Sequence, residues 1–312
     1  GRRDNKYKAR IKILVKETGV DRFKTLVMQE WKEIKNGPLT ITEQEIKRCK
    51  DYFIDPNYEK LLDAPDTLIS ELHNNVLFKS WYDQNVNSHK RPGYSIVTVC
   101  FKETGVAPGD ISDVQLNLVA DLADEYSFSE VRVTHHQNIV LANVRQSDLP
   151  ALWHKLSNAS LSTANLGLLT DMICCPGGDF CALANAKSLP IAESIQRQFP
   201  NEKILRKIGA LRINISGCMN ACGHHHVGNI GILGVDKKGE EFYQVSLGGS
   251  SRNQASIGKI IGPAFSESEI PIVIQTIVDT YLSLRISKEE FIDTYKRVGI
   301  EPFKEKVYAN TD

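Results

Sequence analysis

Two pairs of cysteines constrain this chain more than any other feature. Cys175 and Cys181 are separated by five residues, and Cys218 and Cys222 by three. Four thiolates from two segments match the ligand count of an iron–sulfur cluster or of a tetrahedral zinc site. Zinc ribbons and knuckles usually place their paired cysteines at other spacings, so the pattern favours a cluster. Whatever fold the chain adopts must bring these two segments together.

Small residues surround both pairs. The run 176–178 is Pro-Gly-Gly, which allows a tight turn, and Gly217 and Gly223 bracket the second pair. Small residues also let backbone N–H groups approach cluster sulfurs. Two plainer interpretations remain open at this point, namely four buried structural cysteines and a zinc site.

Composition narrows the class of protein. The chain has 312 residues, enough for two domains, and its 38 basic and 38 acidic residues balance. We therefore expect neither a nucleic-acid partner nor a membrane surface, although a local basic patch around an anionic cofactor is compatible with this balance. The longest apolar stretch, 270–284, is interrupted by Gln275 and Asp279. Seven cysteines, four of them at metal spacing, indicate a reducing, cytoplasmic setting.

The first part of the chain is predicted to be helical and then irregular. Apolar spacing predicts two helices over 7–34, interrupted at Gly19. Residues 39–92 are polar and read as a long connection with a short helix capped at Thr42 and with Trp81 as an anchor.

From residue 94 the pattern changes to alternation. A strand over 94–101, a helix over 112–126, strands over 131–134 and 139–144, and a helix over 148–156 give the order of a ferredoxin-like half-domain.

The remainder should carry the cysteines on loops. We expect a helix over 182–198, a strand over 211–215 and two strands over 230–235 and 241–247. Capping boxes at 266–269 and 287–290 predict two final helices.

The two cysteine segments, 173–184 and 214–223, together with 230–234 and 247–249, resemble the sulfite and nitrite reductase hemoproteins. That family couples siroheme to a [4Fe-4S] cluster, and the chain looks most like the C-terminal half of a bacterial assimilatory sulfite reductase. The resemblance implies an α+β fold, with a ferredoxin-like half-domain followed by a mixed α/β domain that binds siroheme and the cluster. The implied division is the end of a first siroheme-type domain over 1–38, a connection over 39–92, the half-domain over 93–158 and the cofactor domain over 159–312.

The resemblance also implies site residues. The cluster ligands would be Cys175, Cys181, Cys218 and Cys222. Cys222 would also bridge to the siroheme iron. Cys174 offers an alternative first ligand, but the family pattern and the following proline favour Cys175.

Further contacts are implied around siroheme. Asn220 would meet a siroheme carboxylate, and Thr134, Gln137 and Asn138 match a T-x-x-Q-N element that approaches the cofactors; a solvent-exposed hairpin turn is the alternative for these three. Arg132 and Arg212 are weaker candidates. The histidines 224–226 are expected to be a polar lining rather than a separate metal site.

The implied reaction is the six-electron reduction of sulfite to sulfide in sulfur assimilation, with nitrite reduction to ammonia as the alternative within the family. No dinucleotide fingerprint is present, so a ferredoxin or a flavoprotein would supply electrons. The catalytic residues stay unassigned, because the basic cluster that binds substrate is expected mostly on a first half outside this chain. We therefore expect the chain alone to be incomplete as an enzyme. A structural or electron-relay module with four cysteine ligands is the competing hypothesis from another class.

Overall fold

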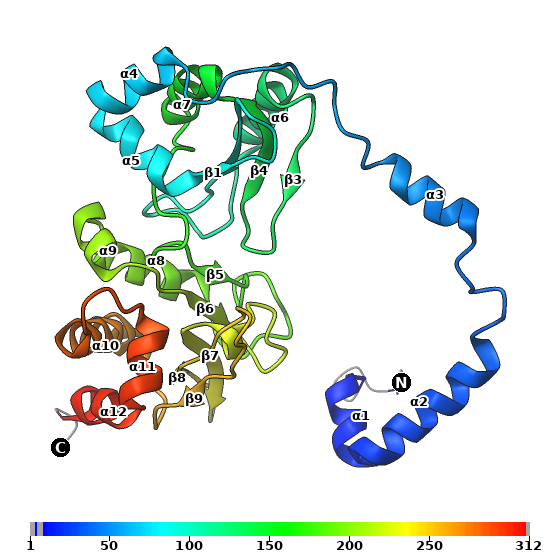
Figure 1. Cartoon of the computed structure of the whole chain (residues 1–312). Coiled ribbons are helices and arrows are strands. Elements are labelled where there is room, and N and C mark those ends of the chain that lie inside the picture. The colour runs from blue at the N-terminus through cyan, green and yellow to red at the C-terminus, as the bar shows by residue number, and fades with distance from the viewer. Residues whose placement is uncertain (1–3, 5–8, 310–312) are drawn as a thin grey trace. The chain divides into compact units, whose positions relative to one another are not determined.

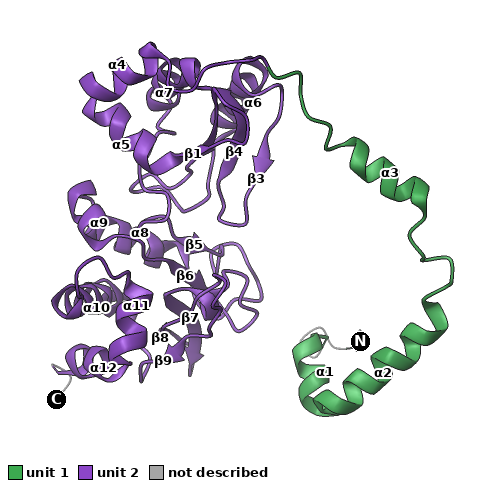
Figure 2. Ribbon diagram, in the orientation of Figure 1, with its two compact units in different colours: residues 1–58 green, residues 59–312 purple. Residues whose placement is uncertain are grey.

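The computed structural model describes residue 4 and residues 9–309, which form two compact units, 1–58 and 59–312 (Figure 2). The four candidate ligands, Cys175, Cys181, Cys218 and Cys222, all lie in the second unit.

Unit 1 consists of separate helices. They are α1 (Ile11–Thr18), α2 (Val20–Ile34) and α3 (Glu43–Asp51). Gly19 separates the first two with φ of 81°, which confirms the predicted interruption. Thr42 caps α3 by accepting a hydrogen bond from the backbone N–H of Glu45, as expected. None of the three helices buries a residue, and Trp31 is 52% exposed.

The first sheet of unit 2 is antiparallel, with strand order β1-β2-β4-β3. It carries helices whose apolar faces share one core with it (Figure 1). The elements are α4 (Asp66–Asn74), α5 (Val76–Asn85), β1 (Val86–Ser88), β2 (Tyr94–Val99), α6 (Asp113–Tyr126), β3 (Arg132–Val133), β4 (Ile139–Arg145), the 3₁₀ turn η1 (Gln146–Asp148) and α7 (Leu149–Asn158).

The segment predicted as a connection is folded from residue 59 onward. Strand β1 pairs with β2, and Phe78 and Trp81 of α5 are buried in the same core as α7. Trp81 is thus an anchor, but for a helix rather than for a loop. The sequence-based expectation missed this because α4 and α5 are short helices of nine and ten residues.

The second sheet has the order β5-β6-β7-β8-β9, in which β5, β6 and β7 are parallel and the last two strands are antiparallel. Its elements are β5 (Ile173–Cys174), α8 (Leu189–Gln198), α9 (Glu202–Ile208), β6 (Ile213–Ser216), η2 (His225–Val227), β7 (Ile230–Lys237), β8 (Glu240–Leu247), β9 (Lys259–Ile260), η3 (Glu267–Glu269), α10 (Ile270–Leu284), α11 (Phe291–Val298) and α12 (Glu301–Tyr308). The mixed α/β architecture and the α+β class are as predicted.

Three local predictions for this region need correction. The helix expected over 182–198 begins only at Leu189, because Ala186 and its neighbours hydrogen-bond to Gly217 instead of to a helical turn. Residues 202–208 form α9, a helix that was not predicted between the expected helix and the strand over 211–215. Ser266 and Glu269 form the expected capping box, whereas Glu290 caps α11 without a side-chain bond, and α12 was not foreseen.

Candidate metal centre

The second sheet places both cysteine segments at the carboxyl ends of its parallel strands. Strand β5 ends at Cys174 and pairs in parallel with β6, with Ile173 opposite Asn214 and Cys174 opposite Ile215. The carboxyl ends of neighbouring parallel strands lie at the same edge of a sheet, which is where open α/β sheets bind ligands. Cys175 follows β5 directly, and Cys218 follows the end of β6 by two residues. The topology therefore brings together segments that are far apart in sequence.

A hydrogen bond joins the two segments at the cysteines themselves. The backbone N–H of Gly217 donates to Sγ of Cys175 over 3.1 Å. The carbonyl of Gly217 accepts from the N–H groups of Asn185 and Ala186 at 2.8 and 3.1 Å. The residue before Cys218 is thus fixed to the loop that contains Cys175 and Cys181.

The first loop turns tightly at Gly177, which has φ of 61°. A Cβ there would lie 2.5 Å from the backbone nitrogen of Ser188, so no larger residue fits without movement. The N–H of Cys181 closes the turn by donating to the carbonyl of Gly177 over 2.9 Å. These contacts confirm that the Pro-Gly-Gly run serves a compact turn.

The second loop folds back onto β6. The N–H of Gly223 donates to Oγ of Ser216 over 3.1 Å, and Nδ2 of Asn214 donates to the carbonyl of Gly223 over 2.9 Å. A Cβ on Gly223 would lie 1.9 Å from the carbonyl oxygen of Ile215. The chain between Cys218 and Cys222 is therefore held by backbone packing that only glycine permits.

The four predicted ligands differ in exposure. Cys175 and Cys181 are half-buried, Cys218 is buried and Cys222 is exposed. None of the seven cysteines forms a disulfide. Across residues 9–309 no three His, Cys, Asp or Glu side chains converge closely enough to hold a metal ion. The structure brings the segments together, but it does not bring the four sulfur atoms into a ligand set.

Cys174 and Cys175 lie in different environments. Cys174 is 2% exposed and belongs to the core of the second sheet, and burial raises the pKa of its thiol well above the ordinary value. A buried thiol that resists ionisation is a poor metal ligand. Cys175, which points toward Gly217 and Ser188, is the better candidate.

The residues of the T-x-x-Q-N element turn toward the cysteine segment. Oγ of Thr134 holds the hairpin turn by bonding to the backbone of Asn138. The amide of Gln137 bonds to both backbone groups of Cys174, with its Oε1 accepting at 2.9 Å and its Nε2 donating at 2.8 Å. The solvent-exposed turn is therefore wrong for Gln137 and Asn138, since Asn138 is buried. A contact from these three residues to a cofactor remains a prediction.

The other sequence-derived candidates have varied surroundings. Asn220 is half-buried within the second loop, and Arg132 is exposed beside Glu130, with which it pairs at 2.5 Å. Arg212 is half-buried near His136. Burial, together with the positive charge of Arg212, lowers the pKa of His136 to about 4, so this imidazole is neutral at neutral pH. Of the histidines that follow Cys222, His225 is 3% exposed and the other two are exposed.

Sequence reasoning missed a buried ion pair beside the site. Nζ of Lys102 lies 2.7 Å from Oδ1 of Asp171, and Lys102 is only 1% exposed. The sequence held one signal, namely that Lys102 directly follows the apolar strand predicted over 94–101. A lysine that is buried at the end of such a strand needs a partner of opposite charge. The partner could not be read from the sequence, since it is far along the chain.

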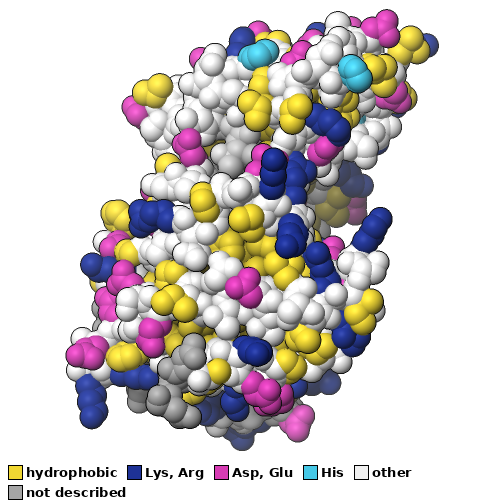
Figure 3. Space-filling model, turned by 90° about the vertical axis from the view of Figure 1, so that its left-hand side faces the viewer, with side chains coloured by type: hydrophobic (Ala, Val, Ile, Leu, Met, Phe, Trp, Pro, Cys, Tyr) yellow, Lys and Arg dark blue, Asp and Glu magenta, His cyan; other side chains and the backbone are white. Residues whose placement is uncertain are grey.

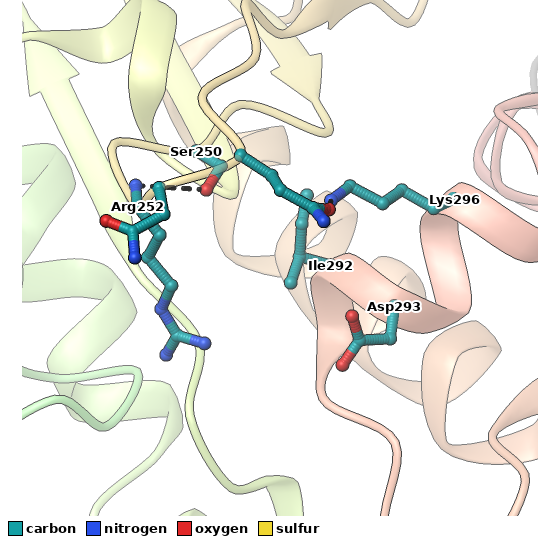
Figure 4. A pocket seen from close by; sticks show the side chains of 7 residues that line it. Ser250, Arg252, Ile292, Asp293 and Lys296 are labelled. Carbon is teal, nitrogen blue, oxygen red and sulfur yellow. Dashed lines mark hydrogen bonds between the residues drawn. The ribbon is translucent and has the colours of Figure 1, made fainter.

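The cavity shown in Figure 4 is separate from the cysteines. It has a volume of about 480 Å³ and lies between the loop after β8 and helix α11. Lys296 reaches Oε1 of Gln254 across it at 3.1 Å, and Arg252 pairs with Glu290. Because its two cations are already satisfied within the protein, the cavity offers no evident anion site.

Two family models match this chain. The model of the nitrite and sulphite reductase 4Fe-4S domain matches residues 168–312, and that of the nitrite/sulfite reductase ferredoxin-like half domain matches residues 92–159. The chain belongs to the nitrite and sulfite reductase family. The cofactors of this family are siroheme and a [4Fe-4S] cluster. The matched domain over residues 168–312 is the one named for the cluster.

Curated relatives agree at modest identity. The chloroplastic ferredoxin–nitrite reductase of Betula pendula is 27% identical over 307 residues, which cover 94% of this chain and 45% of the relative. Sulfite reductase [ferredoxin] 2 of Mycolicibacterium paratuberculosis is 27% identical over 198 residues, covering 60% of this chain and 36% of the relative. The chain thus spans less than half the length of these relatives.

A solved structure supports the fold. The NirA protein of Mycobacterium tuberculosis matches with a TM-score of 0.65 at 23% identity, over 97% of this chain and 50% of that one. Among the described residues, no helix is both long enough and apolar enough to cross a membrane.

Proposed function

We propose that this chain is the cluster-binding part of a siroheme-dependent reductase that acts on nitrite or sulfite. The observation that carries the proposal is the hydrogen bond from the N–H of Gly217 to Sγ of Cys175, which joins the two cysteine segments at one sheet edge. Backbone N–H groups that point at thiolate sulfur stabilise its negative charge, and such bonds tune the potential of iron–sulfur clusters.

The chain's residues divide the work of holding the cofactors. Cys175, Cys181, Cys218 and Cys222 would be the cluster ligands, and their donor set suits iron–sulfur chemistry. The glycines around them let the loops pack closely on neighbouring atoms, where a Cβ would collide. The small residues of both loops would let the four sulfur atoms converge on the cluster.

Cys222 would serve siroheme as well as the cluster. It is the exposed member of the set, so its sulfur remains accessible from outside the loop. Siroheme, when bound, supplies the iron at which the oxyanion is reduced. Asn220, in the same loop, would contact a carboxylate of siroheme.

Nitrite is the favoured substrate. The relatives named as ferredoxin–nitrite reductases from Betula pendula and Arabidopsis thaliana align over 94% and 93% of this chain, against 60% for the sulfite reductase. Sulfite, the substrate that the resemblance in sequence favoured, is the second candidate.

A ferredoxin is the proposed electron donor, since the relatives of both kinds carry it in their names. A small acidic donor does not require a strongly basic surface over the whole molecule. Figure 3 shows basic and acidic side chains interspersed on one face, which agrees with the balanced charge of the chain. We also propose a cytoplasmic or equivalent reducing location, because the cysteines are free.

The test compares the two substrates on the full-length protein. Reduced ferredoxin is supplied, and ammonia and sulfide are measured as products. A kcat/KM for nitrite above that for sulfite supports the favoured substrate, and the reverse order supports the second. The 312-residue chain alone should show little turnover with either anion. A chain that binds zinc and no porphyrinoid would instead support a structural or relay module.

A further inference from the structure

The first cysteine segment is held at its outer edge by a side chain rather than by a strand. Strand β5 is the edge strand of its sheet, with β6 on one side only. On that side, the N–H of Cys175 donates to the carbonyl of Ile215 over 3.1 Å. On the open side, both backbone groups of Cys174 bond to the amide of Gln137. A side-chain amide offers one acceptor and one donor group. It therefore makes the two hydrogen bonds that a neighbouring strand would otherwise make with the backbone of Cys174.

The position of Gln137 is fixed from the ferredoxin-like half-domain. Gln137 has φ of 58°, a left-handed conformation that costs free energy for a residue other than glycine. Its side chain packs on Gly109, where a Cβ would lie 3.0 Å from Cβ and 3.3 Å from Nε2 of Gln137. The left-handed backbone of Gln137 and its close packing on Gly109 both fix the direction of its side chain. They direct the amide to the backbone of Cys174.

A buried ion pair anchors the same contact. Nζ of Lys102 has three acceptors, namely Oδ1 of Asp171 at 2.7 Å, Oδ1 of Asn138 at 3.1 Å and the carbonyl of His136. Asp171 also accepts from Nδ2 of Asn138 at 3.1 Å. The pair therefore ties the residues on both sides of Gln137 to the residue four positions before Cys175.

We propose that Gln137, anchored by Lys102 and Asp171, sets the register of β5 and so presents Cys175 rather than Cys174 to the cluster. Side chains alternate along a strand, and a slip of one residue would exchange the two thiols. Because Cys174 and Cys175 are adjacent, a strand that slipped by one residue would still offer a thiol to the cluster, but the wrong one. The proposal rests on the proposed function only in taking Cys175 as a ligand. Gln137 is then a positioning residue, since it acts through the backbone of Cys174.

The test measures thiol accessibility in the 312-residue chain without its cluster. Gln137→Glu keeps the size of the side chain but removes the donor and places a carboxylate beside the carbonyl of Cys174. The matched control is Gln198→Glu, because Gln198 is exposed. Alkylation of each cysteine by iodoacetamide is followed by peptide mass spectrometry. Cys100, which is buried in the first sheet and bonds to Asn165, reports global opening.

The expected result is specific to one thiol. In Gln137→Glu the alkylation rate of Cys174 should rise about tenfold, as loss of a paired hydrogen bond predicts, with Cys100 and the control unchanged. Gln137→Gly, which relieves the left-handed strain while removing the amide, should give the same increase. A Cys174 rate equal to that of the wild type, or an equal rise at Cys100, would overturn the proposal.

Iron retention separates this proposal from the ligand assignment. After anaerobic reconstitution, Cys174→Ala should keep its iron and Cys175→Ala should lose it. If Cys175→Ala keeps its iron, the ligand assignment of the proposed function is wrong, whatever the alkylation shows. If that assignment holds and Gln137→Glu retains iron against a chelator as long as the wild type does, the positioning role is overturned.

Discussion

At the residue scale, glycines decide whether the cysteine loops can form. Gly223→Ala places a Cβ 1.9 Å from the carbonyl oxygen of Ile215, a backbone atom that cannot move aside easily. We expect the free energy of unfolding to fall by about 1–3 kcal/mol, with loss of reconstituted iron. Urea denaturation and an iron assay measure both effects.

Gly178→Ala is the matched control in the first loop. Its added Cβ would have no neighbour closer than 3.4 Å, which is an ordinary contact. Its stability should stay within about 0.5 kcal/mol of the wild type. Equal losses in the two variants would show that the close approach at Gly223 is not the cause.

His136 should make the stability of the chain depend on pH. Its folded pKa of about 4 lies below the ordinary 6.5, because of burial and of Arg212, with His135 and Lys102 acting in the same direction and Asp171 opposing them. The unfolded chain therefore binds a proton first as the pH falls. The stabilisation is complete above pH 6.5 and is lost progressively down to about pH 4.

The size of this effect is modest because His136 is only half-buried. After allowance for solvent screening, we expect a loss of roughly 1–2 kcal/mol between pH 7 and pH 4.5. Urea unfolding of the wild type and of His136→Gln at several pH values measures it. A difference between the two proteins that does not change with pH would contradict the assignment.

The residue-scale predictions from sequence were strongest where spacing alone carried the information. The two cysteine spacings predicted that the two segments come together, and the Pro-Gly-Gly run at 176–178 predicted a tight turn. The roles of Gln137 and Lys102 could not be foreseen, because their partners, Cys174 and Asp171, are distant in sequence and one of the contacts is to backbone.

At the element scale, the ion pair between Lys102 and Asp171 joins the end of β2 to the segment that leads into β5. Lys102→Met leaves the carboxylate of Asp171 buried without its cation, although Asn138 and the N–H of Gly167 still donate to it. We expect a loss of about 3–5 kcal/mol in the free energy of unfolding.

A double variant tests the cause of that loss. Lys102→Met combined with Asp171→Leu removes both charges and should recover part of the stability, since a buried pair is often replaceable by apolar side chains. Denaturant unfolding of the single and double variants gives the comparison. If the loss of unfolding free energy in the double variant equals the sum of the losses in Lys102→Met and Asp171→Leu, the two charges do not interact.

Elements with strong periodicity were predicted well and short ones were not. The helix α6 and the hairpin of β7 and β8 follow the expected ranges closely. Helix α8 starts later than expected because the preceding residues bond to Gly217, a contact that local propensity cannot reveal. Strand β1 has three residues and is defined only by its pairing with β2.

At the scale of the whole molecule, the two sheets of unit 2 have separate cores, and Cys175, Cys181, Cys218 and Cys222 lie on loops that follow strands of the second sheet. Two side chains next to strands of the first sheet contact the chain near the cysteines. Gln137 bonds to the backbone of Cys174, and Lys102 pairs with Asp171. The half-domain, which has no predicted cysteine ligand of its own, thus holds the strand that precedes Cys175.

We propose above all that the chain binds an iron–sulfur cluster through Cys175, Cys181, Cys218 and Cys222. The most direct measurement is the visible absorption spectrum of the chain purified without air, with iron, labile sulfide and zinc assayed on the same sample. We expect a broad visible absorption with about four irons and about four sulfides per chain, and the loss of both in Cys175→Ala. A colourless chain that contains zinc and no sulfide would contradict it.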